Sequence, residues 1–391
     1  MKTIHTIIAY ACEDAGSEPS VGYHWSKYIA QLKPANNITV ITRKNNDISL
    51  LIENYNINKI EIDLPSNLIF IKKIIGIRLY YLIWKFLVFI HLIKNFSRYK
   101  QGIVHHITFT PIYYPPIYFC LPFKFNWGPI GGGESYPLAY YKSMMLADVI
   151  NEIFRSILKY SIYINPLFYF GCYRSSLIIS STEETTQLIP KLYRKKVVTE
   201  LMVIDNDKND LVDIGNQTII IANRLINWKM THLFVDAFDA FLQISDTQYK
   251  LIIIGDGKYF SKIKPYIDSK NINHYSRFKD RNDMLDALKK SSLFVSMSLR
   301  DSGAASLLEA ISYGIPYLVT NSGAHKLFLN NGVGYSFKPS NYEADKAKII
   351  KILSCVLNDN AVLQSERDKV RALYTSVFSE KVKKERLSNF F

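Results

Sequence analysis

Short runs of β-branched residues alternate along the chain with longer stretches that repeat apolar residues at helical spacing. Several runs have the length and composition of buried strands. In the first half they are Thr3–Tyr10, Asn37–Thr42, Lys59–Leu64, Gly102–Ile107, Phe123–Trp127 and Ser176–Ser180, and in the second half Gln217–Ala222, Tyr249–Ile254, Ile272–Tyr275, Leu293–Ser296 and Tyr317–Thr320. Strands separated by helical stretches predict βαβ units, and hence parallel sheets covered by helices on both faces.

These strands are too many for one compact sheet, so the pattern predicts an α/β protein with two doubly wound, Rossmann-like domains. The polar, acidic stretch 205–210 separates the two halves and is typical of an interdomain linker. We therefore expect a first domain at 1–204 and a second that begins at 205.

The composition agrees with a folded protein and adds a charge bias. Hydrophobic residues make up 48% of the 391 residues and charged residues 21%, which excludes wholesale disorder. Lys and Arg number 48 against 34 Asp and Glu, a net charge of +14 that favours anionic partners. No recognised nucleic-acid-binding motif accompanies that charge. The four cysteines lie far apart, which predicts neither a metal cluster nor a disulfide framework and fits a reducing compartment.

The N-terminal run predicts a strand rather than a signal peptide, so we expect a cytoplasmic protein. The segment 68–100 complicates this picture, because it holds seven basic residues and no acidic ones around an apolar middle at 74–93. Arg78 and Lys85 lie near its centre, where each would cost about 2.5–3.5 kcal/mol inside a bilayer. The segment therefore predicts a helix that lies at a membrane surface or packs against the core.

Ligands of such sheets bind beyond the carboxyl ends of the strands, so the loops after strands are where chemistry is expected. The loop after the first strand contains Gly16, Ser17, Glu18 and Gly22 and leads into an amphipathic helix. Backbone N–H groups at a helix N-terminus can hold an anion. The dinucleotide fingerprint G-x-G-x-x-G is absent, which argues against a nicotinamide enzyme.

His105 and His106 end the fourth predicted strand. A histidine in that position can act in proton transfer or donate to a substrate hydroxyl. The alternative is a pair of half-buried structural histidines.

A glycine run follows the next strand, as Gly131, Gly132, Gly133 and then Glu134. Successive glycines cost backbone entropy, which close approach of a ligand or special dihedral angles would justify. The run is not a P-loop, because no Gly-Lys-Ser/Thr follows it. A flexible hinge is the alternative.

The second half places two cations, Arg224 and Lys229, just past a strand, where both can face one phosphate group. The alternative is a pair of solvated surface charges. The next strand ends in a tight turn at Gly255.

One loop of the second half combines an acid, small residues and the start of a helix. Its chemically relevant residues are Asp301, Ser302, Gly303, Ala304, Ala305 and Glu309. The backbone amides at the helix start can hold a diphosphate, helped by the helix dipole. Glu309 can accept hydrogen bonds from two ribose hydroxyls, and Asp301 from sugar hydroxyls.

Together these loops resemble family 4 of the retaining nucleotide-sugar glycosyltransferases, which have the GT-B fold. The resemblance rests on GSEPSVGYHW (16–25), WGPIGGGE (127–134), NRLINWK (223–229), IIIGDG (252–257) and LRDSGAASLLEAISYGIP (299–316). The last run is similar to the family's pair of acids separated by seven residues. It departs from that pattern in having Asp301 where Glu is commoner.

The resemblance implies two domains facing a central cleft, the second at 205–375, with a C-terminal helix at 376–391 that crosses back to the first domain. Arg224, Lys229, Gly255, Ser302 and the amides of 303–305 would bind the donor diphosphate, with Glu309 on the ribose. Asp301 would bind donor sugar hydroxyls, and His105 or His106 would face the reacting centre. The loops at 16–22 and 131–134 would face the acceptor or a phosphate.

The implied activity is transfer of a sugar from a nucleoside diphosphate sugar to an acceptor hydroxyl with retention of configuration. We expect no cofactor and no metal, a UDP-sugar ahead of a GDP-sugar, and a lipid-linked or growing surface polysaccharide as acceptor, which would place the protein at the inner face of the plasma membrane. The stretch Asp205-Asn206-Asp207 mimics an Asp-x-Asp metal motif but falls in the expected linker. A nucleotide-sugar epimerase of the same fold and a non-catalytic partner of a transferase are the alternatives.

Overall fold

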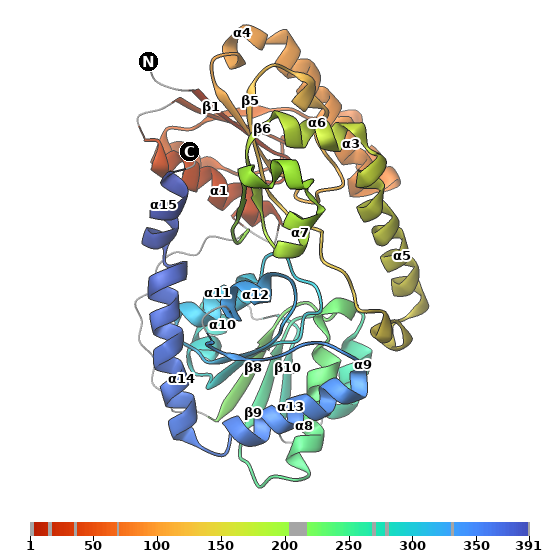
Figure 1. Cartoon of the computed structure of the whole chain (residues 1–391), viewed down its shortest axis with the longest axis vertical. Helices are drawn as coiled ribbons and strands as arrows, with labels where there is room; N and C mark the ends of the chain where they lie inside the picture. The colour runs from red at the N-terminus through yellow and green to blue at the C-terminus, as the bar shows by residue number, and fades with distance from the viewer. Residues whose placement is uncertain are drawn as a thin grey trace. The chain divides into compact units, whose positions relative to one another are not determined.

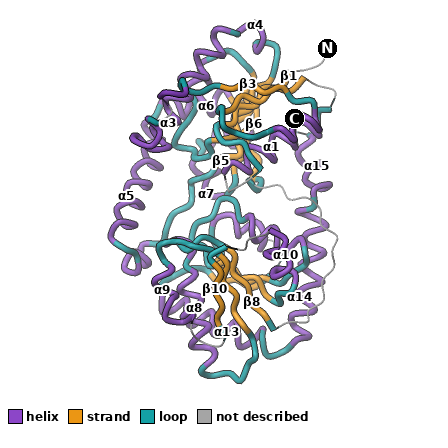
Figure 2. The backbone as a smooth tube through the Cα atoms, turned by 180° about the vertical axis from the view of Figure 1, so that it is seen from behind, coloured by secondary structure: helices purple, strands orange, loops and turns teal. Residues whose placement is uncertain are grey.

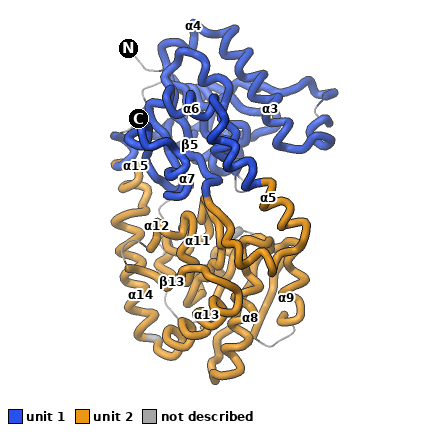
Figure 3. Tube along the Cα trace, turned by 45° about the vertical axis from the view of Figure 1, so that its right-hand side comes forward, with its two compact units in different colours: residues 1–133, 155–204, 386–391 blue, residues 134–154, 205–385 orange. Residues whose placement is uncertain are grey.

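The computed structural model describes residues 4–14, 18–34, 37–68, 70–202, 217–267, 271–277, 281–329 and 332–389. The chain divides into two compact units (Figure 3). Unit 1 comprises 1–133, 155–204 and 386–391, and unit 2 comprises 134–154 and 205–385. The stretch expected to be a linker, 205–210, and its Asp-x-Asp sequence lie outside the described residues.

Two segments lie in a different unit from the one that the sequence predicts. The prediction assigns 134–154 to the first domain, but these residues belong to unit 2. The reason is packing, since Tyr140 is part of the unit 2 core and its hydroxyl donates to the carboxylate of Asp345. The predicted C-terminal segment begins at 376, whereas only 386–391 belong to unit 1, where Leu387 is fully buried in the core.

Unit 1 is built on a seven-stranded sheet in the order β3-β2-β1-β4-β5-β6-β7, and every pair of neighbours is parallel. Its strands are β1 (Ile4–Ala9), β2 (Asn37–Thr42), β3 (Asn58–Glu61), β4 (Ile103–Thr108), β5 (Lys124–Ile130), β6 (Ser175–Ser180) and β7 (Val197–Thr199). Its α-helices are α1 (Glu18–Leu32), α2 (Ser49–Tyr55), α3 (Ile71–Lys94), α4 (Phe96–Tyr99), α6 (Pro166–Arg174) and α7 (Glu183–Leu188), and α5 (Leu146–Tyr160) belongs partly to each unit. Short 3-10 turns lie at 66–68, 117–120, 161–164 and 191–196.

Unit 2 has a six-stranded parallel sheet in the order β10-β9-β8-β11-β12-β13. Its strands are β8 (Thr218–Ala222), β9 (Lys250–Ile254), β10 (Ile272–Tyr275), β11 (Leu293–Ser296), β12 (Tyr317–Thr320) and β13 (Tyr335–Phe337). Its helices are α8 (Thr231–Leu242), α9 (Phe260–Ile267), α10 (Arg281–Lys289), α11 (Ala305–Ser312), α12 (Lys326–Leu329), α13 (Tyr342–Val356), α14 (Asn360–Leu373) and α15 (Glu380–Ser388), the last ending in unit 1. Short helical turns lie at 138–143, 227–229, 323–325 and 374–378.

Every strand that the hydrophobic pattern predicts is present, with bounds that differ by at most a few residues. The pattern misses β7 and β13, which are three residues long and lie at the edges of their sheets, too short for a periodic signal. Helices lie on both sides of each sheet (Figures 1 and 2), as expected for parallel sheets.

The strand orders indicate where a ligand binds in each unit. In unit 2 the chain moves outward from β8 in both directions, through β9 on one side and β11 on the other. A crevice forms beyond the carboxyl ends of the strands at such a switch point, because the two connections leave in opposite directions. In unit 1 the corresponding point lies between β1 and β4.

Helix α3 contains most of the basic segment 68–100. It is long and apolar enough to cross a membrane by length and composition. Its inner face nevertheless packs into the unit 1 core through Tyr80, Tyr81, Trp84, Val88 and Leu92. The Lys85 ammonium is buried too and donates to the carbonyl of Pro115 at 3.1 Å. The prediction of a helix that packs against the core is therefore confirmed.

Candidate functional site

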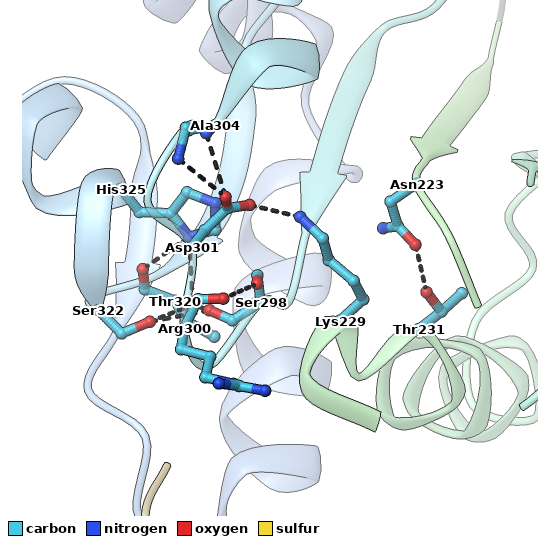
Figure 4. Close-up of polar contacts among 11 residues, drawn as sticks. Asn223, Lys229, Thr231, Ser298, Arg300, Asp301, Ala304, Thr320, Ser322 and His325 are labelled. Carbon is cyan, nitrogen blue, oxygen red and sulfur yellow. Dashed lines mark hydrogen bonds and ion pairs between the residues drawn. The ribbon is translucent and has the colours of Figure 1, made fainter. Parts of the chain in front are cut away.

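The loops after β8 and β11 meet at the switch point of unit 2. The Trp228 carbonyl accepts a hydrogen bond from the Leu299 amide at 2.8 Å, which ties the two loops together. This contact brings Lys229 beside Asp301, and the ammonium of Lys229 forms an ion pair with the Asp301 carboxylate (Figure 4). Both side chains keep about one-seventh of their surface exposed, 15% each, so solvent reaches the pair.

Asp301 also organises its own loop. Its Oδ1 accepts hydrogen bonds from the amides of Gly303 at 3.1 Å and Ala304 at 3.2 Å, just ahead of helix α11. Burial alone would raise the pKa of Asp301. The charge of Lys229 and the hydrogen bonds outweigh burial and hold the pKa well below its ordinary value. Asp301 is thus ionised at neutral pH.

These contacts modify one expectation about phosphate binding. The prediction leaves the amides of Gly303, Ala304 and Ala305 free for a diphosphate, but two of them already donate to Asp301. Open space surrounds Gly303, since a Cβ there would contact nothing within 4 Å. Ala304 adopts φ +47°, a left-handed conformation that turns the chain into α11.

The loop after β12 contacts the backbone of Asp301, a contact that the sequence did not predict. The Asp301 carbonyl accepts from the Ala324 amide at 2.7 Å, and a Cβ on Gly323 would lie 2.5 Å from that carbonyl oxygen. His325 is fully buried in the same loop, and burial lowers its pKa to about 4 despite the attraction of Asp301. The signal available in the sequence is the run Asn321-Ser322-Gly323 directly after a buried strand.

A second missed feature is the setting of Arg300, the neighbour of Asp301. Its guanidinium lies 4.3 Å from the centroid of the Trp228 ring and pairs with the Glu152 carboxylate at 3.2 Å. Glu152 is only 2% exposed, so this ion pair is desolvated. Trp228 and Arg300 are the chain neighbours of Lys229 and Asp301. They are held by their cation–π contact and by the ion pair of Arg300 with the buried Glu152 carboxylate.

Three of the remaining predicted donor residues follow the same two strands, and Gly255 follows β9. Arg224 is exposed directly after β8, Ser302 is half-buried beside Asp301, and Glu309 is half-buried on α11. Gly255 adopts φ +141°, and a Cβ there would lie 1.8 Å from the Asn223 carbonyl oxygen. Gly255 is thus required by the close approach of the loops after β8 and β9.

Comparison with known proteins identifies the domain that contains this site. Residues 204–367 match the sequence model of the family described as Glycosyl transferases group 1. The matched segment is less than half of the chain. It includes Arg224, Lys229, Asp301 and Glu309, so the segment similar to this family contains the cluster just described.

More distant similarities agree with this assignment and with the GT-B fold. Protein CapJ of Staphylococcus aureus is 24% identical over 151 residues, a match that spans 37% of each chain. A glycosyltransferase of Rickettsia africae superposes with a TM-score of 0.63 at 14% identity, covering 100% of this chain and 97% of that one. Anabaena HepE, solved in complex with UDP and glucose, gives a TM-score of 0.62 at 10% identity over 99% and 98% of the two chains. The fold of this chain is therefore GT-B.

The two histidines predicted to face the reacting centre lie inside β4 and are buried in unit 1. His105 Nε2 lies 2.9 Å from His5 Nδ1, and the two rings stack. His106 Nδ1 lies 2.5 Å from the Tyr118 hydroxyl and its Nε2 lies 3.3 Å from the Tyr81 hydroxyl. Burial lowers the pKa of His106 to about 3, and that of His105 well below its ordinary value. The structure thus favours the alternative, two structural histidines, over a catalytic role.

The glycine run at 131–133 is explained by internal packing. A Cβ on Gly133 would lie 2.4 Å from the Thr185 Cα, and the Gly133 amide donates to the Thr185 hydroxyl at 3.1 Å. Gly131 pairs with the segment at 110–112, and Gly132 has φ +93°. The chain passes from unit 1 to unit 2 directly after this run, at the buried Glu134.

The loop after β1 is also tied down within unit 1. The Glu18 carboxylate accepts from the amide of Thr110 at 2.8 Å and from its hydroxyl at 3.2 Å. Gly22 approaches the Ala11 carbonyl oxygen so closely that a Cβ would lie 2.0 Å from it. Gly16 and Ser17 lie outside the described residues. Glu18 and Gly22 thus join the loops after β1 and β4 at the switch point of unit 1.

Proposed function

We propose that this protein transfers a sugar from a nucleoside diphosphate sugar to an acceptor hydroxyl, with retention of the anomeric configuration. The observation that carries the proposal is the Lys229–Asp301 pair at the switch point of a glycosyl transferases group 1 domain. A cation and an ionised carboxylate side by side match the two ends of such a donor, its diphosphate and its sugar hydroxyls. The UDP and glucose bound by Anabaena HepE support the same donor class, and a UDP-sugar is proposed ahead of a GDP-sugar.

The donor would replace the internal ion pair with contacts of its own. Lys229 would turn to the diphosphate together with Arg224, and Asp301 would accept hydrogen bonds from the sugar. Glu309 would accept from the ribose hydroxyls. When Asp301 turns away, the amides of Gly303 and Ala304 would become free for a phosphate oxygen at the start of α11.

The chemistry exchanges one bond at the anomeric carbon for another. The bond from that carbon to the phosphate oxygen breaks, the bond to the acceptor oxygen forms on the same face, and the acceptor proton passes to the departing diphosphate. Lys229 and Arg224 stabilise the negative charge that develops on the diphosphate. These cations supply the positive charge that a metal ion would otherwise provide.

The acceptor we propose is a lipid-linked or growing surface polysaccharide, such as a capsule, O-antigen or exopolysaccharide chain. The name of CapJ is consistent with a capsule role. Helix α3 presents exposed Lys73, Arg78 and Lys94, and the chain has no Asp or Glu between 64 and 133. Basic residues near an anionic leaflet contribute about 1 kcal/mol each, which would hold the protein at the inner face of the plasma membrane.

A thermal-shift screen of UDP-, GDP- and other nucleotide sugars tests the proposed donor. A specific donor raises the melting temperature by mass action, and we expect the largest rise with a UDP-sugar. Transfer to a glycan extract, followed by determination of the product's anomeric configuration, tests the reaction. A protein whose melting temperature no nucleotide sugar raises does not have the proposed function.

A further inference from the structure

Helix α5 has its polarity reversed relative to an ordinary surface helix. Its charged residues, Asp148, Glu152, Arg155 and Lys159, recur at helical spacing and are all 2–7% exposed. The opposite face is apolar and lies in solvent. Its residues, 49–76% exposed, are Leu146, Ile150, Ile153, Phe154, Ile157 and Tyr160. A soluble protein normally turns such a helix the other way, with its apolar stripe toward the core.

Contacts of the charged face fix this orientation. In unit 2, Asp148 pairs with Lys258, and Glu152 pairs with Arg300 at 3.2 Å. In unit 1, the Arg155 guanidinium donates to the Gly132 carbonyl at 3.2 Å and the Lys159 ammonium to the Gly133 carbonyl at 3.5 Å. A helix rotated to hide its apolar face would break all of these contacts and expose desolvated partners. The outward apolar face is therefore built into the fold.

The outward face has the composition of a segment that meets lipid. No charged side chain of α5 is exposed, and the 3-10 turn that follows continues the face with Tyr163 at 49% and Ile164 at 86% exposure. Tyr160 and Tyr163 stack with their ring centroids 6.3 Å apart. Tyrosines are enriched where an apolar surface passes into the headgroup region, because each combines an apolar ring with a polar hydroxyl.

The net charge of the protein favours a lipid surface over a second copy of this chain as the partner that covers the outward face of α5. Unit 1 contains 22 Lys and Arg against 10 Asp and Glu, so 12 of the 14 net positive charges belong to it. The C-terminal part of the outward face, from Ile157 to Ile164, belongs to this unit. Two copies joined there would bring like charges together, whereas an anionic leaflet attracts them. Helix α3 adds exposed Ile74, Leu79 and Phe86 among its basic residues, so a bilayer can contact apolar and basic groups of the same unit.

We propose that the outward face of α5 inserts among the lipids of an anionic membrane surface and supplies an apolar, salt-resistant part of membrane binding. This goes beyond attraction of the basic α3 and rests on the proposed function only in that a lipid-linked acceptor lies at the same surface. The inner face of α5 meanwhile holds Arg300, the neighbour of Asp301, through Glu152. The helix that contacts lipid thus also supports the donor loop.

Sedimentation with vesicles of phosphatidylcholine and phosphatidylglycerol tests the insertion. The full chain is compared with the double variant Ile150→Gln/Ile157→Gln at about 0.1 M and about 1 M NaCl, since the higher salt screens the charge attraction of exposed groups. We expect wild-type binding to fall but persist at the higher salt. The double variant should lose about tenfold or more of that persistent binding.

Two further variants separate the contributions. Leu192→Gln/Ile244→Gln replaces apolar residues of similar exposure, 72% and 70%, away from α5 and should bind as the wild type does. Lys73→Gln/Arg78→Gln/Lys94→Gln should weaken binding at low salt and leave the salt-resistant part intact. The proposal fails if the α5 variant keeps its salt-resistant binding or if the Leu192/Ile244 control loses as much.

Analytical ultracentrifugation addresses the rival occupant. A wild-type dimer that Ile150→Gln/Ile157→Gln converts to monomer would assign the face to a second copy and overturn the proposal; we expect monomers for both proteins without lipid. The thermal response of the double variant to nucleotide sugars should equal that of the wild type. Absence of that response in the wild type would refute the proposed function and leave the vesicle result standing.

Discussion

The loop after β11 in unit 2 and strand β4 in unit 1 each contain polar residues that the sequence predicts to be functional. At β11, Asp301 is half-buried and pairs with Lys229, a side chain that also reaches solvent. At β4, His105 and His106 point into the core and contact other core side chains. The difference shows that residue type and predicted position do not by themselves make a residue functional; burial and partners decide it.

The largest expected effect is on catalysis, and it comes from substitutions in unit 2. Arg224→Ala and Glu309→Ala should each lower kcat/KM for sugar transfer by about 10²–10³-fold, since each removes a charged contact to the donor. Steady-state kinetics with the best nucleotide sugar of the screen measures this. Lys351→Ala, an exposed cation on α13, is the matched control and should transfer normally.

Normal rates in both Arg224→Ala and Glu309→Ala would place the donor elsewhere. Urea denaturation shows whether the same variants fold normally. Substitution of an exposed or half-buried side chain should change the free energy of unfolding by no more than about 0.5 kcal/mol.

On the unit 1 side we expect an effect on stability. His106→Ala leaves the Tyr118 hydroxyl buried without its partner and opens a cavity, which should lower the free energy of unfolding by about 2–4 kcal/mol. The kcat of the folded fraction should stay close to the wild-type value. A folded His106→Ala protein with a large loss in kcat would restore the catalytic interpretation of this residue.

Two glycine substitutions compare the packing of the glycine run in unit 1 with that of the loop after β11 in unit 2. Gly133→Ala forces a methyl group against the Thr185 backbone and should cost about 1–3 kcal/mol of stability. Gly303→Ala places its methyl group in open space and should change stability by less than about 0.5 kcal/mol. Thermal or urea unfolding compares them, and only Gly303→Ala should weaken the response to a nucleotide sugar. Equal stability losses would mean that the loop after β11 is as tightly packed as the glycine run.

The last effect is a pH dependence. The pKa of His106 is about 3 in the folded protein, below its ordinary value of 6.5, because burial disfavours the charged ring. Its contribution to stability is therefore complete above pH 6.5 and is lost as the pH falls toward 3. The wild type should lose up to about 1.4 kcal/mol per pH unit more than His106→Gln in that window. Urea midpoints at a series of pH values measure the difference, and parallel pH profiles would contradict it.

Sequence patterns predict the strands and the sheets better than they predict the contacts between side chains. The runs of β-branched residues predict both sheets, and the loops after β8 and β11 contain the donor candidates, because residue type and spacing determine both. Which partner Asp301 takes depends on long-range geometry, and so do the burial of His106 and the pairing of Glu152 with Arg300. Helix α5 makes the point most plainly. Its periodicity shows one apolar and one charged face, but only the tertiary contacts show that the charged face points inward.

Calorimetric titration of UDP into the wild type and Lys229→Ala tests the central claim most directly, that unit 2 grips a donor diphosphate through the crevice between β8 and β11. Wild type should bind, and Lys229→Ala should bind about tenfold or more weakly, because a charge-assisted hydrogen bond contributes about 1.5–3 kcal/mol. Equal affinity of the two proteins for UDP would contradict the account.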